Sequence, residues 1–225
     1  MKDAAAPPLA PEAIVELHDP AGVLVRWHCT PEGLDELAIG WLIGEGRAPS
    51  VAAAGPIEVD GLARRVRLTA PVADLRRPVT TPPEGPPRFP HLTDALAEHP
   101  GTIRELFQAM FDRAALRELT GGLHTGALVE HREVVCVRED ASRHCVVDKL
   151  VGHAALAGRS LEGAVILLSG RISGAIAAKA ARTGVAVVAT MSIPTTLAAE
   201  IAGRAGVTLI GRARAAAPHV YRPGS

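Results

Sequence analysis

The sequence predicts an α/β protein in two parts: a smaller N-terminal α+β unit and a C-terminal domain with three α/β/α layers. After Leu128, runs of branched aliphatic residues alternate with glycine or serine turns and helix-favouring segments, as in helices packed on a largely parallel sheet. Six prolines fall within residues 76–90 and exclude helix or central strand there. We therefore expect the unit at residues 1–75, a linker at 76–90 and the domain at 91–225.

Two β-hairpins are expected in the N-terminal unit. The motif Asp19-Pro20-Ala21-Gly22 carries proline and glycine where a tight turn uses them, and Asp60-Gly61 offers a second turn. Each turn lies between short runs rich in β-branched residues, which is typical of hairpin strands. The four predicted strands are residues 13–15, 23–27, 57–59 and 66–68.

One helix is predicted between these hairpins. Thr30 is a suitable N-cap and Pro31 suits a first helical turn. Apolar side chains then recur at helical spacing until Gly44 and Gly46 interrupt the pattern. The apolar positions of this helix are Leu34, Leu37, Ala38, Trp41 and Leu42.

The C-terminal domain is expected to open with a helix and continue as alternating strands and helices. Thr102 and Glu105 form a capping box before an apolar helical face. In sheets of this kind, ligands bind beyond the carboxyl ends of the strands, where loops and helix N-termini meet. The predicted strands are residues 134–137, 164–168, 185–189 and 207–210, and the predicted helices 147–156, 172–182 and 195–204.

Composition argues against several classes of partner. The 24 basic and 24 acidic residues cancel, so no large field of one sign draws the chain to nucleic acid or membrane. Aromatic residues are only 3%, which leaves few platforms for base stacking. The first eleven residues lack the apolar core of a signal peptide, and no apolar run is long enough to span a bilayer. We expect a cytoplasmic protein without nucleic-acid or membrane partners.

Three clusters of glycine, serine, histidine and charge adjoin the apolar strands, and each has a plain structural interpretation. A Gly-Gly pair before a strand is usually a turn. A Ser-Gly-Arg motif after a strand is usually a helix cap with a solvated arginine, and an Asp-Lys pair commonly lies on a helix surface. The clusters are Thr120-Gly121-Gly122-Leu123-His124, the run from Glu139 to Lys149, and Ser169-Gly170-Arg171.

Taken together, the clusters predict a site for an anionic ligand. A loop that opens a helix offers unpaired N–H groups and the positive end of the helix dipole. Arg143, Lys149 and Arg171 add charged donors suited to phosphate oxygens. We therefore expect the three clusters to converge on one pocket.

Cys145 is the candidate nucleophile among the three cysteines. It follows His144 at an expected helix start, where the dipole and nearby cations would lower a thiol pKa; the alternative is an inert, partly buried helix residue. Cys136 lies within an apolar run and is expected to be buried strand filler. No C-x-x-C spacing suggests a zinc site.

The ordered set of motifs resembles the formate dehydrogenase accessory sulfurtransferase family (FdhD/NarQ). The match extends over nearly the whole chain, from Cys29-Thr30-Pro31 to Tyr221. Between these ends it includes Leu34, Glu36-Leu37-Ala38, Gly40, Leu42, Glu45-Gly46, Thr120-Gly121-Gly122, His124, Glu139-Asp140, Arg143-His144, Val147-Asp148-Lys149, Ser169-Gly170-Arg171, Ser173, Lys179, Pro194-Thr195 and Leu197-Ala198.

This resemblance implies a C-terminal domain similar to the cytidine deaminase fold and a homodimer. It implies sulfur transfer from a cysteine desulfurase to the guanine-dinucleotide form of the molybdenum cofactor, bound as cargo, before its insertion into formate dehydrogenase. The zinc signatures of the deaminases are absent, so no protein-ligated metal is expected. Bound cofactor or guanine nucleotide would contact Gly121, Gly122, His124, Asp140, Arg143, His144, Asp148, Lys149, Ser169, Gly170 and Arg171.

Within that set, Arg143, Lys149 and Arg171 are expected to contact phosphate or pyrophosphate, together with the helix-start amides. Polar positioning of the pterin or guanine falls to His124, Asp140, Asp148 and Ser169.

The chain departs from the family pattern at the sulfur-carrying cysteines. Family members resemble one another in a loop bearing C-x-x-C, whereas the span from Leu75 to Leu119 holds no cysteine here. A persulfide relay needs a nucleophilic thiolate. Either Cys145 replaces the loop cysteines, or the protein binds the cofactor or a guanine nucleotide without sulfur transfer. A third possibility is a nucleotide-binding module serving an unrelated complex.

Overall fold

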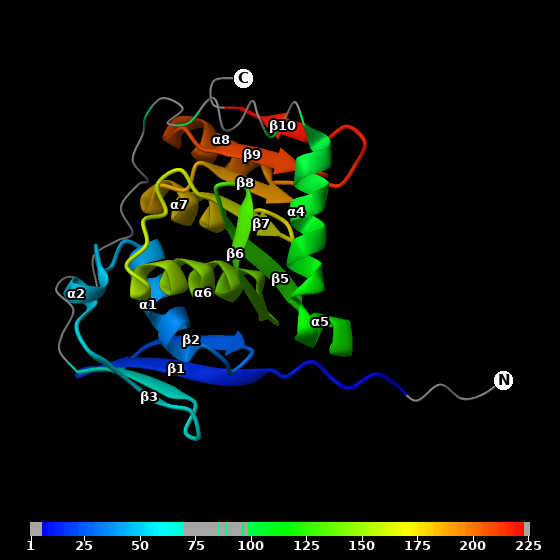
Figure 1. Ribbon diagram of the computed structural model, residues 1–225. Helices are drawn as coiled ribbons and strands as arrows, with labels where there is room; N and C mark the ends of the chain where they lie inside the picture. The colour runs from blue at the N-terminus through cyan, green and yellow to red at the C-terminus, as the bar shows by residue number, and fades with distance from the viewer. Residues whose placement is uncertain (1–5, 70–84, 86–88, 90–95, 97–98, 223–225) are drawn as a thin grey trace.

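Two β-sheets and the helices that pack on them make up the computed structural model (Figure 1), which describes residues 6–69, 85, 89, 96 and 99–222. The predicted linker, residues 76–90, lies outside the described residues except for Gly85 and Phe89. Within the described part of the chain, no helix is long and apolar enough to cross a membrane.

The first sheet has four strands and contains both predicted hairpins. Its strand order is β2-β1-β4-β3; β1 pairs antiparallel with β2 and parallel with β4, and β3 pairs antiparallel with β4. Alternation along β1 turns Val15 and Leu17 into the core. The elements of this unit are β1 (Ala13–Asp19), β2 (Gly22–Cys29), α1 (Leu34–Gly44), α2 (Val51–Ala54), β3 (Ile57–Asp60) and β4 (Arg65–Leu68).

The predicted N-cap of α1 is wrong. The helix begins at Leu34 after Gly33, whose backbone is left-handed (φ 59°). Thr30 is instead fully buried: its hydroxyl donates to the Pro11 carbonyl at 2.9 Å and accepts from the Ala141 amide at 3.2 Å. The tertiary contacts of Thr30 therefore outweigh its preference for a helix end, and glycine makes the turn.

The second sheet has six strands in the order β10-β9-β8-β7-β5-β6. β7 pairs parallel with β8, and β8 with β9. β6 runs in the same direction as these three, whereas β5 is antiparallel to both β6 and β7, and β10 is antiparallel to β9. The four predicted strands therefore share one direction, but the sheet is mixed because β5 and β10 run against them. His131 and Arg132, both with positive φ, close β5 and β6 into a tight hairpin. The strands are β5 (His124–Glu130), β6 (Glu133–Asp140), β7 (Val165–Leu168), β8 (Val187–Thr190), β9 (Thr208–Gly211) and β10 (His219–Tyr221).

Helices cover both faces of this sheet and give the predicted three layers (Figure 1). One apolar core joins α6, α7 and α8 to one face of the strands, and a second joins α4 to the opposite face. The capping box is wrong: α4 begins at Pro100 behind His99, and Thr102 lies inside its first turn. The helices are α4 (Pro100–Asp112), α5 (Ala115–Thr120), α6 (Arg143–Leu156), α7 (Gly174–Thr183) and α8 (Thr196–Ala205).

The two parts of the chain share a close interface at the crossing of α1 and α6. A Cβ added at Gly40 would lie 1.7 Å from the Asp148 carbonyl oxygen, and one at Gly152 would lie 1.9 Å from the Glu36 carbonyl oxygen. The two backbones therefore touch directly. Arg138 and His153 both bond the Glu36 carboxylate beside this crossing, so α1 joins the first sheet to the larger domain.

Candidate functional site

The predicted motifs gather at one edge of the six-stranded sheet. Strands β6, β7 and β8 end there and β5 begins there, because His124 pairs with Asp140, Gly126 with Leu168, and Leu168 with Thr190. Helices α6 and α7 also begin at this edge, because a loop of two residues joins β6 to α6 and a loop of five residues joins β7 to α7. Three strand ends and two helix N-termini thus form the arrangement in which α/β sheets bind anions.

His124, Arg143 and Gly170 form the centre of this edge. A Cβ at Gly170 would lie 3.0 Å from His124 Nδ1 and 3.6 Å from the Arg143 Cβ, so glycine lets the three segments approach. Burial, with help from the charges of Arg143 and Arg117, lowers the pKa of His124. At neutral pH His124 is therefore uncharged, and its ring can accept as well as donate a hydrogen bond.

The two arginines at the edge offer free donors. Arg143 is half-buried, and its Nε has no hydrogen-bond partner among the described residues. Arg171 is exposed on the loop after β7. An unsatisfied buried donor costs free energy unless a ligand or water completes it, which makes Arg143 the best-placed cation for an anionic group.

His144 and the neighbouring serines continue the site toward α7. The His144 Nε2 lies 2.9 Å from the Ser173 hydroxyl, which also accepts from the Ile176 amide at the start of α7. Burial and the charges of Arg143 and Lys179 lower the pKa of His144. Ser169 is turned into the sheet edge, where its hydroxyl accepts from the Thr125 amide at 2.9 Å.

Lys149 and Asp140, both predicted to contact the ligand, are buried and paired with each other. They form an ion pair at 2.6 Å in which both side chains are buried, and the Lys149 ammonium also donates to the Thr30 carbonyl at 3.0 Å. Burial raises the pKa of Asp140, although Lys149 opposes this shift. The pair is covered because β2 ends against α6, a tertiary contact that the local motif does not reveal.

Asp148 forms a second buried ionic group with Lys179, whose ammonium also lies 3.0 Å from Glu45. Burial raises the pKa of Asp148 to about 6. The interpretation of Asp148-Lys149 as a helix-surface pair is wrong as well, because the two side chains have different partners and both are buried. The sequence motifs contain Glu45, Lys179 and Ser173, but the predicted set of ligand-contacting residues did not include them.

The expected low pKa of Cys145 is also wrong. A hydrogen bond with the Cys29 thiol, together with burial, raises the pKa of Cys145, and its side chain is 3% exposed. Cys145 is the third residue of α6, yet it points into the core shared with β2 instead of toward the helix N-terminus. Burial raises the pKa of Cys136 to about 11, in agreement with its predicted place in an apolar strand.

Gly121 and Gly122 lie at the rim of the edge. Gly121 ends α5 in a left-handed conformation (φ 69°), and both glycines are exposed. A Cβ at Gly122 would lie 3.1 Å from the Ala10 Cβ, so the N-terminal segment runs beside this turn. Both glycines therefore serve the turn geometry, as their plain interpretation expects.

A pocket of about 410 Å³ opens next to the edge, between β2 and the first turns of α6 and α7. Its lining includes His144, Cys145 and the buried Asp148–Lys179 pair. We call it the β2–α6 pocket. Its lining residues are Val25, Arg26, Trp27, His28, Trp41, Glu45, Ser142, His144, Cys145, Asp148, Ala175 and Lys179.

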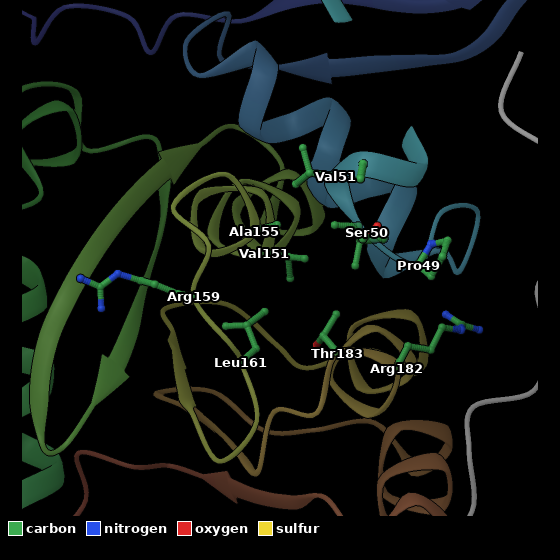
Figure 2. A pocket seen from close by; sticks show the side chains of 11 residues that line it. Pro49, Ser50, Val51, Val151, Ala155, Arg159, Leu161, Arg182 and Thr183 are labelled. Carbon is green, nitrogen blue, oxygen red and sulfur yellow. The ribbon is translucent and has the colours of Figure 1, made fainter. Parts of the chain in front are cut away.

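A second hollow of about 400 Å³ lies beside α2, at the far end of α6 and α7. Figure 2 shows side chains of α2, α6 and α7 converging on it, among them Val51, Val151 and Thr183. None of the described residues that line it belongs to the predicted site. Also within the described residues, no group of three His, Cys, Asp or Glu side chains could hold a metal ion.

Comparisons with known proteins agree with this architecture. A family model described as the FdhD/NarQ family matches residues 11–224. A protein named sulfur carrier protein FdhD from Geobacillus kaustophilus is 30% identical over 209 residues, which cover 86% of this chain and 80% of the relative. A protein of the same name from Streptomyces avermitilis is 44% identical over 130 residues, but these cover only 57% of this chain and 44% of the relative.

A crystal structure also resembles the fold. It is that of a protein from Desulfotalea psychrophila described as a formate dehydrogenase accessory protein, with a TM-score of 0.79 and 22% sequence identity. The superposition covers 95% of this chain and 88% of the other. At this identity the likeness establishes the shared fold, two sheets with packed helices included.

Proposed function

The chain belongs to the FdhD/NarQ family, and from that premise we propose that it is an accessory protein for the maturation of formate dehydrogenase. Its proposed cargo is the guanine-dinucleotide form of the molybdenum cofactor, held as substrate at the strand edge. Formate dehydrogenase and a cysteine desulfurase are the proposed partners, and the proposed assembly is a homodimer in the cytoplasm with a domain similar to the cytidine deaminase fold.

The observation that carries this proposal is the Nε of Arg143, which has no hydrogen-bond partner in the described part of the chain and lies where helix N-termini converge. A pyrophosphate group would satisfy that donor, and Arg171 lies on the adjacent loop to add a second charged contact. Neutral His124 is suited to a hydrogen bond with a heterocycle. Gly170 supports the proposal because any side chain there would press on His124.

The roles proposed for the remaining predicted residues follow from where they lie. His144 reaches the ligand from the β2–α6 pocket, and Gly121, Gly122 and Ser169 shape the rim. Lys149 and Asp140 act from behind by fixing the start of α6, and they make no ligand contact in this proposal. Asp148 borders the β2–α6 pocket but is paired with Lys179, and it makes no ligand contact in this proposal either.

Thermal unfolding with guanosine diphosphate tests the binding step. A ligand that binds only the folded state at a hundredfold excess over Kd stabilises it by about 2.7 kcal/mol, so the melting temperature should rise. Adenosine diphosphate serves as the matched nucleotide control. An unchanged melting temperature, with no heat of binding by calorimetry, would remove the ligand site from the proposal.

A second candidate function, cofactor binding without sulfur transfer, is favoured by one observation. All three cysteines are buried, and the span from Leu75 to Leu119 lacks the C-x-x-C pair of the family pattern. Complementation of a strain without its own accessory sulfurtransferase separates the two functions, scored by formate dehydrogenase activity. Activity with the parent but not with Cys145→Ser would identify Cys145 as the sulfur carrier, whereas inactivity of both would support binding alone.

A further inference from the structure

Cys29 and Cys145 bring two thiols together from opposite parts of the chain. Cys29 is the last residue of β2, and Cys145 lies in the first turn of α6. Their side chains are 0% and 3% exposed and belong to the same apolar cluster. The two thiols interact as hydrogen-bond partners, so the fold places a dithiol at the junction of the N-terminal sheet and the larger domain.

Flanking contacts hold this dithiol in place. The residue after Cys29, Thr30, accepts a hydrogen bond from the Ala141 amide at 3.2 Å, just before α6. The Thr30 carbonyl accepts from Lys149 at 3.0 Å, one helical turn after Cys145. Lys149 and Cys145 lie on the same face of α6 because residues four apart share a face. The end of β2 is therefore fixed against α6 on both sides of the thiol pair.

A small molecule would reach the pair from the β2–α6 pocket through Cys145 alone. Cys145 is one of the residues that line this pocket of about 410 Å³. Ser142 and His144 flank it there, and Trp27 and His28, the two residues before Cys29, line the facing wall. Cys29 and Cys136 are both absent from the described lining, but Cys29 shares an apolar cluster with Cys145, whereas Cys136 lies in the core of the six-stranded sheet.

We propose that Cys29 and Cys145 form a reversible disulfide by exchange with a small disulfide such as oxidised glutathione. In the first step one of the two thiols loses its proton and its sulfur attacks the small disulfide, releasing one small thiol and leaving a mixed disulfide. The second cysteine then attacks the mixed disulfide, the Cys29–Cys145 bond forms, and a second small thiol leaves. Two electrons pass from the protein thiols to the small disulfide, which is reduced to two thiols.

This bond would join β2 to α6 covalently and would remove a thiol from the wall of the β2–α6 pocket. The inference is independent of the proposed function, because it needs neither cofactor nor sulfur donor. It also assigns a role to Cys29, which an account based on persulfide transfer leaves unexplained.

Thiol counting and peptide mapping of the full-length chain test the proposal. The protein is incubated with oxidised glutathione at mildly alkaline pH, quenched with acid, unfolded and alkylated. Alkylated thiols in the wild type should fall from the three cysteines of the sequence to Cys136 alone, and digestion without reductant should yield a peptide pair linking Cys29 and Cys145. Dithiothreitol should restore all three.

Matched variants sharpen the result. Cys136→Ser should still form the linked peptide pair and should leave no alkylated thiol after oxidation. Cys29→Ser and Cys145→Ser should form no internal disulfide. If a serine in the core prevents these variants from folding, the wild type decides the matter by itself, through its thiol count and the linked peptide pair. Three thiols that stay reduced, a linkage that includes Cys136, or glutathione adducts without the internal bond would each overturn the proposal.

Discussion

The first and second turns of α6 carry similar polar residues but have opposite surroundings. In the first turn, Arg143 and His144 face the open sheet edge, and Arg143 keeps a donor without a partner. One turn later, Asp148 and Lys149 are buried in separate ion pairs. A run of charged residues in the sequence therefore does not mark one site, because the fold divides it between ligand-facing groups and structural ones.

The cause of the difference is α1, which crosses α6 at its second turn. Gly40 brings the backbone of α1 against the Asp148 carbonyl, and Glu45, which follows α1, adds a carboxylate beside Lys179. Charged groups enclosed in this way are stable only when they are paired. The four predictions that follow first test the buried residues beside the crossing of α1 and α6. The last tests the first turn of α6 at the open sheet edge.

Substitution of Gly152 by alanine should have the largest effect. Its Cβ would lie 1.9 Å from the Glu36 carbonyl oxygen, so α1 and α6 would have to separate. We expect a loss of more than about 4 kcal/mol in the free energy of unfolding, measured by urea denaturation. Gly203→Ala is the control, because nothing lies within 4 Å of a Cβ there and alanine favours the helix by roughly 1 kcal/mol. Equal stability of the two variants would contradict the close contact between α1 and α6 at Gly152.

Removal of the Lys149 charge should have the next largest effect on the free energy of unfolding. Lys149→Met leaves Asp140 buried without its cation, so we expect a loss of about 3–5 kcal/mol in the free energy of unfolding. Arg171→Met, in the exposed loop, should change it by no more than about 0.5 kcal/mol. Similar losses in the two variants would mean that Lys149 is solvated, as its sequence motif suggested.

The pH dependence of stability should report the enclosure of Asp148. Burial raises its folded-state pKa to about 6 from the ordinary 3.8. Between these values the folded state binds more protons than the unfolded state, so this group lowers the free energy of unfolding as pH rises. The asparagine variant Asp148→Asn lacks this titration. Its free energy of unfolding should therefore rise, relative to that of the wild type, by on the order of 2–3 kcal/mol between pH 4 and pH 7.

Urea titrations across this pH range measure the effect. Glu200→Gln, which alters an exposed carboxylate on α8, is the control and should follow the wild-type profile. If Asp148→Asn also runs parallel to the wild type at every pH, then Asp148 does not titrate in this window and its burial is less complete than the structure indicates.

Substitutions in the open turn should affect binding and leave folding intact. Arg143→Ala and Arg171→Ala should each weaken binding of guanosine diphosphate by about 1.5–3 kcal/mol, roughly ten- to a hundredfold in Kd. Isothermal calorimetry measures the affinity, and the unfolding midpoint without ligand checks the fold. Parent-like affinity in both variants would show that the open turn is an ordinary solvated surface.

The sequence predicted most elements because their signals are local. Both hairpins of the first sheet and the three layers of the larger domain follow from turn chemistry and apolar periodicity. The predicted cap at Thr30 was wrong because its hydroxyl bonds Pro11 and Ala141. The mixed direction of the second sheet was missed because the His131-Arg132 turn carries no glycine and needs left-handed backbone at ordinary residues.

The candidate site was predicted in part for the same reason. The edge residues His124, Arg143 and Gly170 lie together as expected, because strand ends and helix starts are local features that a sheet collects at one edge. The predicted ligand contact of Lys149 and the predicted low pKa of Cys145 were wrong because β2 and α1, which are remote in sequence, cover both side chains. Their orientation depends on which face of α6 the N-terminal unit covers, and no local pattern specifies that face.

The crossing of α1 and α6 also constrains how the chain folds during synthesis. Glu36 and His153, which bond beside the crossing, are 117 residues apart in the chain. When the ribosome has completed α1, the helix that buries its outer face has not yet been made. The N-terminal unit therefore reaches its final packing only after α6 emerges, and until then its apolar surface is a target for chaperones or for aggregation.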